Sequence, residues 1–111
     1  MKPSWKEKWV NALRSGKYKQ TRGNLQDGDG FCCLGVLCDL VDSEAWEEVE
    51  LCSIRSFLGA DTDGRGFAVS DMPPPSVLLT TGLEDPSIYA TLNDEDKYTF
   101  EQIADEIEAN E

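Results

Sequence analysis

Aromatic and aliphatic residues near the N-terminus recur at helical spacing. Trp5, Trp9 and Leu13 lie four residues apart and would share one face of a helix. Ser4 opens a capping box of the form S-x-x-E, in which two side chains bond each other's backbone amides. The pattern therefore predicts a first helix over residues 4–15.

The most apolar stretch of the chain is GFCCLGVLCDL, residues 30–40. Its apolar residues fall at spacings of three and four and cover nearly the whole circumference of a helix. We predict a helix over residues 30–42 at the centre of the fold. Gly35 lies in its middle, where glycine costs about 1 kcal/mol relative to alanine. We interpret this glycine as a point where a neighbouring helix or strand packs closely.

Two more helices are predicted in the second half of the chain. Thr99 and Gln102 have the spacing of a second capping box, and an apolar stripe follows them, which predicts a helix over residues 100–109. Proline at a first turn and Gly82 after a last turn predict a short helix over residues 74–81.

The remaining segments have a weaker pattern. Residues 17–25 are polar and suggest a short extended piece. In residues 46–72 the apolar positions fit neither period, so strand and helix are both open there, with a short strand expected at 67–70. We predict a single α+β domain over residues 1–111, compact and helix-dominated, with a central apolar helix and a few short strands from these segments.

Charge is distributed unevenly along the chain. The net charge is −12, but residues 1–24 hold seven basic residues and one acid, and the remaining residues hold three basic residues and 21 acids. This asymmetry favours self-association into a homo-oligomer or a basic face for an anionic ligand. Alternatively, the acids only keep the protein soluble. Duplex nucleic acid is not expected as a partner, because the acidic part would repel it.

No apolar run approaches the length that spans a bilayer, and the N-terminal segment lacks the apolar core of a signal peptide. We therefore expect a cytoplasmic protein with no membrane partner. Cysteines stay reduced in that compartment.

Four cysteines are the first candidates for chemistry: Cys32, Cys33, Cys38 and Cys52. Adjacent helical residues point about 100° apart, and the chain has no histidine to complete a metal site or to activate a thiol. These cysteines could form a metal site, a Cys38–Cys52 disulfide or a reactive thiolate. We favour the interpretation that they are buried thiols that act as small apolar side chains.

Residues 61–66 resemble the first half of a calcium loop, but the required glutamate is missing at its twelfth position, so we interpret them as a turn. The acids show no pattern that singles out an acid–base pair. No catalytic residue, metal site or cofactor is predicted.

The remaining candidate site is the basic segment RSGKYKQTRG at residues 14–23. Its cations suit phosphate groups, and its tyrosine suits stacking on a base. The ligand-binding residues predicted on this ground are Arg14, Lys17, Tyr18, Lys19 and Arg22. The alternative is an exposed basic loop that pairs with the acidic remainder of the chain.

Three motifs give the chain a resemblance to a known group. They are WVNALRSGKYKQ at residues 9–20, CCLGVLCDL at 32–40, and LND at 92–94 followed by TFEQIADEI at 99–107. In these motifs the chain resembles small uncharacterised proteins encoded by tailed phages and some bacteria. The resemblance implies a phage-type origin and no particular mechanism. Compact proteins of this kind commonly bind something of the host, including its defence machinery.

The leading hypothesis is a phage-type non-enzymatic binding protein that sequesters a small anionic, nucleotide-like ligand through the basic segment. A second hypothesis is an acidic protein–protein inhibitor that covers a basic patch on a host protein, such as one that binds nucleic acid. A third is a small enzyme of unrecognised type, against which the missing histidine counts.

Overall fold

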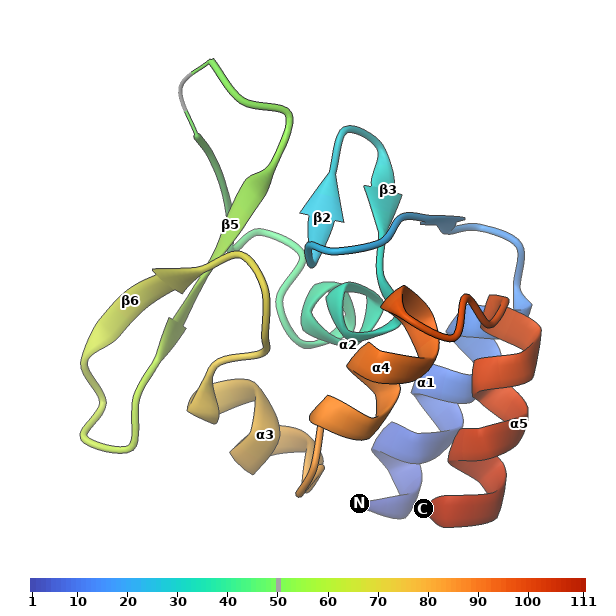
Figure 1. Cartoon of the computed structure of the whole chain (residues 1–111). Helices are drawn as coiled ribbons and strands as arrows, with labels where there is room; N and C mark the ends of the chain where they lie inside the picture. The colour runs from blue at the N-terminus through green and yellow to red at the C-terminus, as the bar shows by residue number, and fades with distance from the viewer. Residues whose placement is uncertain (50) are drawn as a thin grey trace.

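Helix α2 (Cys33–Val41) lies at the centre of the structure, and the other elements are arranged around it (Figure 1). The computed structural model describes residues 1–49 and 51–111. The elements follow one another as α1 (Pro3–Arg14), β1 (Lys19–Gln20), β2 (Gln26–Asp27), β3 (Gly30–Phe31), α2, β4 (Trp46–Glu48), β5 (Arg55–Ala60), β6 (Gly66–Val69), α3 (Pro75–Thr81), α4 (Ser87–Asp94) and α5 (Phe100–Asn110). The predicted α+β fold with a central helix and short strands is confirmed.

Helix α2 is buried on every side over its first two turns, from Cys33 to Cys38. A helix that is apolar all round requires such an environment. One core cluster surrounds it, and its largest side chains include Trp9, Tyr89 and Phe57. The cysteines of this helix therefore act as small apolar side chains of the core.

The closest packing onto α2 occurs at Gly35. A Cβ atom at this position would lie 1.8 Å from the carbonyl oxygen of Leu25, so only glycine fits. That carbonyl accepts a hydrogen bond from the amide of Cys32 at 3.1 Å, and the Leu25 amide donates to the carbonyl of Ser70 at 2.8 Å. The predicted close approach at Gly35 is confirmed, and the neighbour is the segment that leads into β2.

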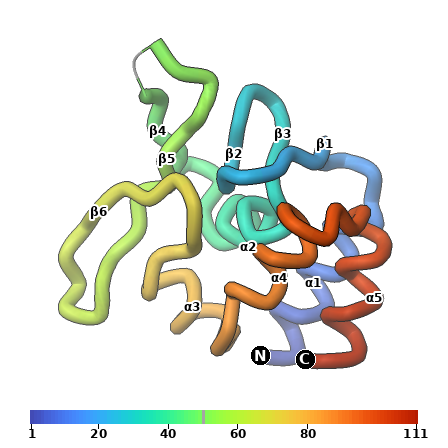
Figure 2. The backbone as a smooth tube through the Cα atoms, viewed as in Figure 1, coloured from blue at the N-terminus to red at the C-terminus, as the bar shows by residue number. Residues whose placement is uncertain are grey.

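Helices α1 and α5 run side by side and bring the two termini together (Figures 1 and 2). The amino group of Met1 lies 3.6 Å from a carboxylate oxygen of Glu111. Helix α5 begins with the predicted capping box: the Thr99 hydroxyl accepts from the Gln102 amide at 3.2 Å, and the Gln102 side chain accepts from the Thr99 amide at 2.9 Å.

The start of α1 differs from its prediction. The helix begins at Pro3, so Ser4 lies inside the first turn and no side chain caps the helix. The predicted capping box at Ser4 is therefore wrong, because proline at the first position already has the helical φ and no amide that needs a partner. Trp9 is fully buried and donates from its indole nitrogen to the Cys33 carbonyl at 2.8 Å, while Trp5 is only half-buried.

Helix α2 begins three residues later than predicted. Gly30 and Phe31 form β3, which pairs with β1 in parallel and with β2 in antiparallel register. Cys32 then caps the helix, and its sulfur accepts from the Gly35 amide at 3.3 Å. Pairing with two neighbouring strands therefore extends the chain at residues where the apolar pattern predicted helix.

Helix α3 ends at Gly82 in left-handed conformation, with φ of 76°, as predicted. Helix α4 was not predicted from the sequence. It places Tyr89 and Asn93 in the core, and the Tyr89 ring packs edge-on against Trp9 with 5.3 Å between ring centroids.

The regular elements described within residues 46–72 are the three strands β4, β5 and β6, so strand is correct for this region and helix is not. They make an antiparallel sheet in the order β4-β5-β6, and the strand predicted at 67–70 is found at Gly66–Val69. Phe57 of β5 is buried in the core cluster, and Trp46 of β4 packs edge-on against Phe31 of β3, so both residues join this sheet to the core. Within the described residues, the helices are all too short or too polar to cross a bilayer.

Replacing Gly35 by alanine is expected to destabilise the protein by about 3 kcal/mol, because the new methyl group would displace the Leu25 backbone and its hydrogen bond to Cys32. Urea denaturation followed by tryptophan fluorescence measures the change. The matched control is Gly66→Ala, where the nearest atom lies 3.7 Å away and a change within about 0.5 kcal/mol is expected. Equal stability of the two variants would contradict the packing at Gly35.

Candidate functional site

Arg14, the last residue of α1, is held by carboxylates of α5. Its guanidinium lies 2.5 Å from Glu108, 2.6 Å from Asp105 and 3.7 Å from Glu101. The hydrogen bonds to Glu108 and then to Asp105 raise the pKa of Arg14 further above its ordinary value. Arg14 therefore joins the first and last helices, and its charge is balanced inside the chain.

Tyr18 is half-buried and serves the fold. Its hydroxyl donates to Asp39 of α2 at 2.7 Å, and its ring packs edge-on against Phe31. Burial and the bond to Asp39 raise the pKa of Tyr18. Asp39 also accepts from the indole nitrogen of Trp46 at 3.0 Å, so one carboxylate connects three segments of the chain. The predicted stacking role of Tyr18 stays a prediction.

Lys17, Lys19 and Arg22 are exposed. The amino group of Lys19 lies 3.4 Å from Asp29 in the β2–β3 turn. Arg22 donates to the carbonyl of Lys97, between α4 and α5, at 3.4 Å. The structure therefore places the predicted ligand-binding residues on one segment, but the side chains of Arg14, Tyr18, Lys19 and Arg22 contact four different parts of the protein.

A buried polar network at Asn93 is a feature that sequence reasoning missed. The Asn93 side-chain oxygen accepts from the Cys33 amide at 3.2 Å and from Gln20 at 2.9 Å, and its nitrogen donates to the Thr21 carbonyl at 3.0 Å. Asp94 accepts from the Gly23 amide at 2.9 Å. The motif LND at residues 92–94 was the available signal. The network fastens the basic segment to the start of α2 and is structural.

The thiols of the central helix are placed away from solvent. Cys32, Cys33 and Cys38 are buried, whereas Cys52 is exposed. Burial raises the pKa of Cys32 to about 11 and raises those of Cys33 and Cys38 as well. The described residues contain no group of three or more acids or cysteines arranged to hold a metal ion. The three buried thiols are thus unsuited to nucleophilic attack near neutral pH.

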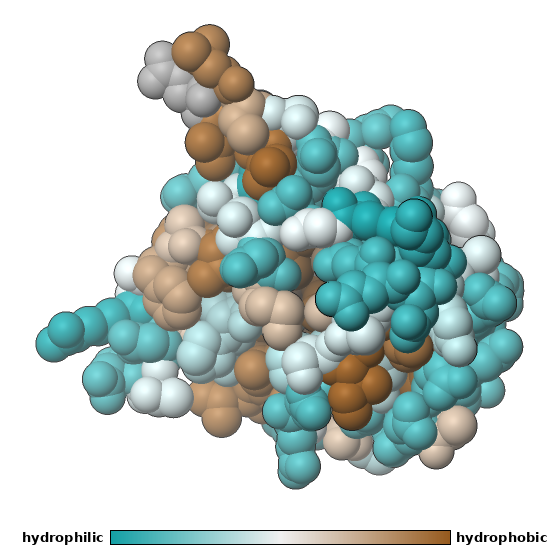
Figure 3. All heavy atoms as spheres, viewed as in Figure 1, coloured by the Kyte–Doolittle hydropathy of each residue, from teal (hydrophilic) through white to brown (hydrophobic). Residues whose placement is uncertain are grey.

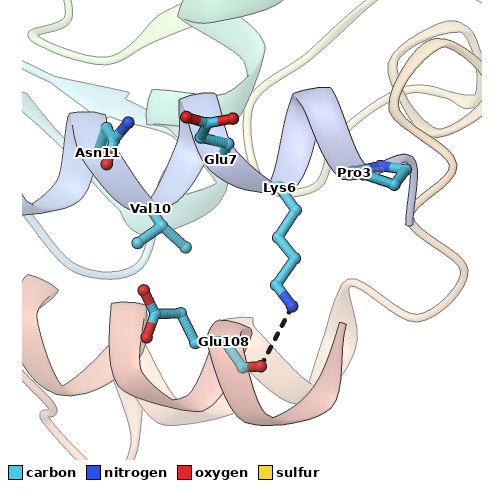
Figure 4. A pocket seen from close by; sticks show the side chains of 6 residues that line it. All are labelled: Pro3, Lys6, Glu7, Val10, Asn11 and Glu108. Atoms are coloured by element: carbon cyan, nitrogen blue, oxygen red, sulfur yellow. Dashed lines mark hydrogen bonds between the residues drawn. The ribbon is translucent and has the colours of Figure 1, made fainter.

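A shallow groove between α1 and α5 is lined by Pro3, Lys6, Glu7, Val10, Asn11 and Glu108 (Figure 4). The Lys6 amino group already donates to the Glu108 carbonyl at 3.2 Å, as Figure 4 shows. Val10 is almost completely buried beneath it. The groove therefore offers mixed charges and little apolar surface to a ligand.

A larger hollow of about 810 Å³ lies between the β2–β3 turn and the β4–β5 turn. Gly28 lines one side of it, and Val49, Leu51 and Cys52 line the other. Both turns project from the same side of α2 (Figure 2). Exposed apolar side chains gather here at a concave surface, so this hollow is the candidate interaction site.

Comparison with protein-family models gives one finding. The model described as Domain of unknown function (DUF8296) matches residues 1–111, which is the whole chain. Neither the comparison with curated proteins nor the comparison with solved structures found a match.

Thiol modification tests the placement of the cysteines. At pH 8 the native protein is expected to react rapidly with one equivalent of Ellman's reagent, at Cys52, because burial keeps Cys32, Cys33 and Cys38 protonated and inaccessible. All four thiols should react in denaturant. Cys52→Ser is the control, and a fast-reacting thiol in that variant would contradict the assignment.

Proposed function

The chain belongs to the family described as Domain of unknown function (DUF8296), which implies no activity, and we propose from the surface of the protein that it is a non-enzymatic binding protein of phage type. Its acidic surface covers a basic patch on a protein of the host cytoplasm. This is the second of the three hypotheses that the sequence suggested.

The pairing of Arg14 with three acids of α5 is the observation that carries this proposal. The sequence suggested that the basic segment faces an anionic ligand, but the charge of Arg14, the first cation of that segment, is already balanced by these acids. Lys19 and Arg55 likewise lie beside Asp29 and Glu48. What the protein offers to a partner is therefore dominated by the excess of 22 acids over ten basic residues.

A partner recognised through this surface would carry clustered lysine and arginine residues. Complementary charge accelerates association and suppresses wrong partners, and salt weakens it. Such an interaction needs no reacting groups on this chain, which suits a core whose thiols are buried.

Capture from a bacterial lysate on the immobilised protein tests the proposal. We expect a protein with a basic patch to be retained at 50 mM NaCl and released at 0.5 M NaCl, because exposed charges are screened over about 4 Å at the higher concentration. Mass spectrometry identifies the captured protein. Retention that is unchanged by salt, or the absence of any retained protein at 50 mM NaCl, would contradict the proposal.

The nucleotide-binding hypothesis stays a prediction, and calorimetry separates it from this proposal. Saturable heat with a mono-, di- or cyclic nucleotide, lost in Arg22→Ala and kept in Arg65→Ala, would favour the basic segment as the site. Both arginines are exposed, and Arg65 precedes β6, outside that segment, which makes it a matched control.

A further inference from the structure

We propose that the turn between β4 and β5 is the anchor of this protein on its partner, and that Leu51, with Val49 beside it, fills an apolar pocket bordered by lysine or arginine. The inference rests on the proposed protein-binding function. It adds the surface that binds and the chemistry of the pocket that receives it.

Two properties of Leu51 are unfavourable for the stability of the fold. Its side chain is completely exposed, and its backbone has φ of 59°, in the left-handed region. Beside it, the Cys52 amide donates to the Val49 carbonyl at 3.2 Å. Glycine or asparagine is favoured where φ is positive, whereas a branched apolar residue is strained. A leucine at this position is neither buried nor in a favourable backbone conformation. Contact with another molecule would explain why a leucine stands here.

The base of the turn is held firmly in place. The Gly28 amide donates to the Ser53 carbonyl at 2.8 Å, and the Ser53 hydroxyl donates to Asp27. Asp27 also forms an antiparallel bridge with Ile54. The β2–β3 turn therefore holds the base of the β4–β5 turn, and the tip projects beyond it (Figure 1). Because the base is fixed in advance, the turn loses less conformational freedom on binding.

The surroundings of the tip indicate the chemistry of the pocket. Apolar surface gathers at the projecting tip in Figure 3, and Val49 and Leu51 supply it. Asp29 of the β2–β3 turn and Glu47 and Glu48 of β4 are exposed beside the tip. Two cations lie among them, Lys19 near Asp29 and Arg55 near Glu48. Acids therefore outnumber cations around the apolar anchor, which complements an apolar pocket with a cationic rim.

Other exposed apolar residues lack these properties. Leu79 on α3 is 66% exposed and Ile88 on α4 is 47% exposed. Both lie in regular helix, and single apolar side chains on a surface are common in folded proteins. They are useful as controls because they are exposed but lie outside the proposed anchor.

The Leu51→Gly variant tests whether Leu51 contributes to the stability of the protein or to binding. Glycine adopts a positive φ without strain, so the melting temperature is expected to stay within about 2 °C of the wild type or to rise. A fall of more than about 4 °C would show that Leu51 works for the fold and would overturn the inference.

Binding is measured with a photo-crosslinker attached through a maleimide to Cys52, the exposed cysteine beside the anchor. In a bacterial lysate at 50 mM NaCl, we expect a cross-link to a partner peptide that contains apolar residues next to lysine or arginine. Leu51→Gly should reduce cross-linking about tenfold or more, and Leu79→Ala should leave it unchanged.

Charge variants test the rim in the same assay. Glu47→Lys with Glu48→Lys should reduce cross-linking at low salt, whereas Glu95→Lys with Asp96→Lys, an identical change of charge at exposed positions after α4, should reduce it much less.

The outcomes separate this inference from the proposed function. Salt-sensitive capture that Leu51→Gly does not weaken would overturn the anchor and leave the function standing. A cross-link to a second copy of the chain, or to an acidic peptide, would also overturn the anchor. No capture by the wild type would overturn both.

Discussion

The carbonyl group of Leu25 lies against Gly35, and much of the fold depends on this approach. The Leu25 carbonyl accepts from the Cys32 amide at the start of α2, and the Leu25 amide donates to Ser70 after β6, so this residue connects the central helix to both sheets. Any side chain at Gly35 would separate these parts. Asn93 secures the neighbouring stretch, because it binds both the Cys33 amide and the carbonyl of Thr21. A polar network and one missing methyl group thus hold an irregular segment on an apolar helix.

This arrangement divides the chain between stability and recognition. The cysteine-rich motif at residues 32–38 lies in the core, where burial raises the pKa of each of its three thiols. The basic segment is fastened to α5, α2 and the α4–α5 connection through Arg14, Tyr18 and Arg22. The proposed function assigns the exposed acidic side chains and the exposed Leu51, whose φ is positive, to contact with a partner. The proposed function follows from what the fold does not use.

Local sequence signals predicted the strongly patterned elements. The box at Thr99, the glycine after α3 and the apolar stripe of α2 were sufficient, because each acts within one or two helical turns. Helix α4 escaped prediction because no side chain caps it and its buried residues include the polar Asn93. Strands of two residues carry no period, so β2 and β3 were not predicted, and β1 was expected only as a short extended piece within residues 17–25. The partners of Arg14 lie more than 85 residues away, and the exposure of Leu51 depends on tertiary structure.

Native-state hydrogen exchange tests the central claim most directly. If the Leu25–Gly35 packing and the Asn93 network hold the fold together, the amides of Cys32 and Cys33 should exchange only by global unfolding. The amide of Cys52, in the projecting turn, should exchange through a much smaller local opening. Exchange of the Cys32 and Cys33 amides as fast as that of Cys52 would contradict the account.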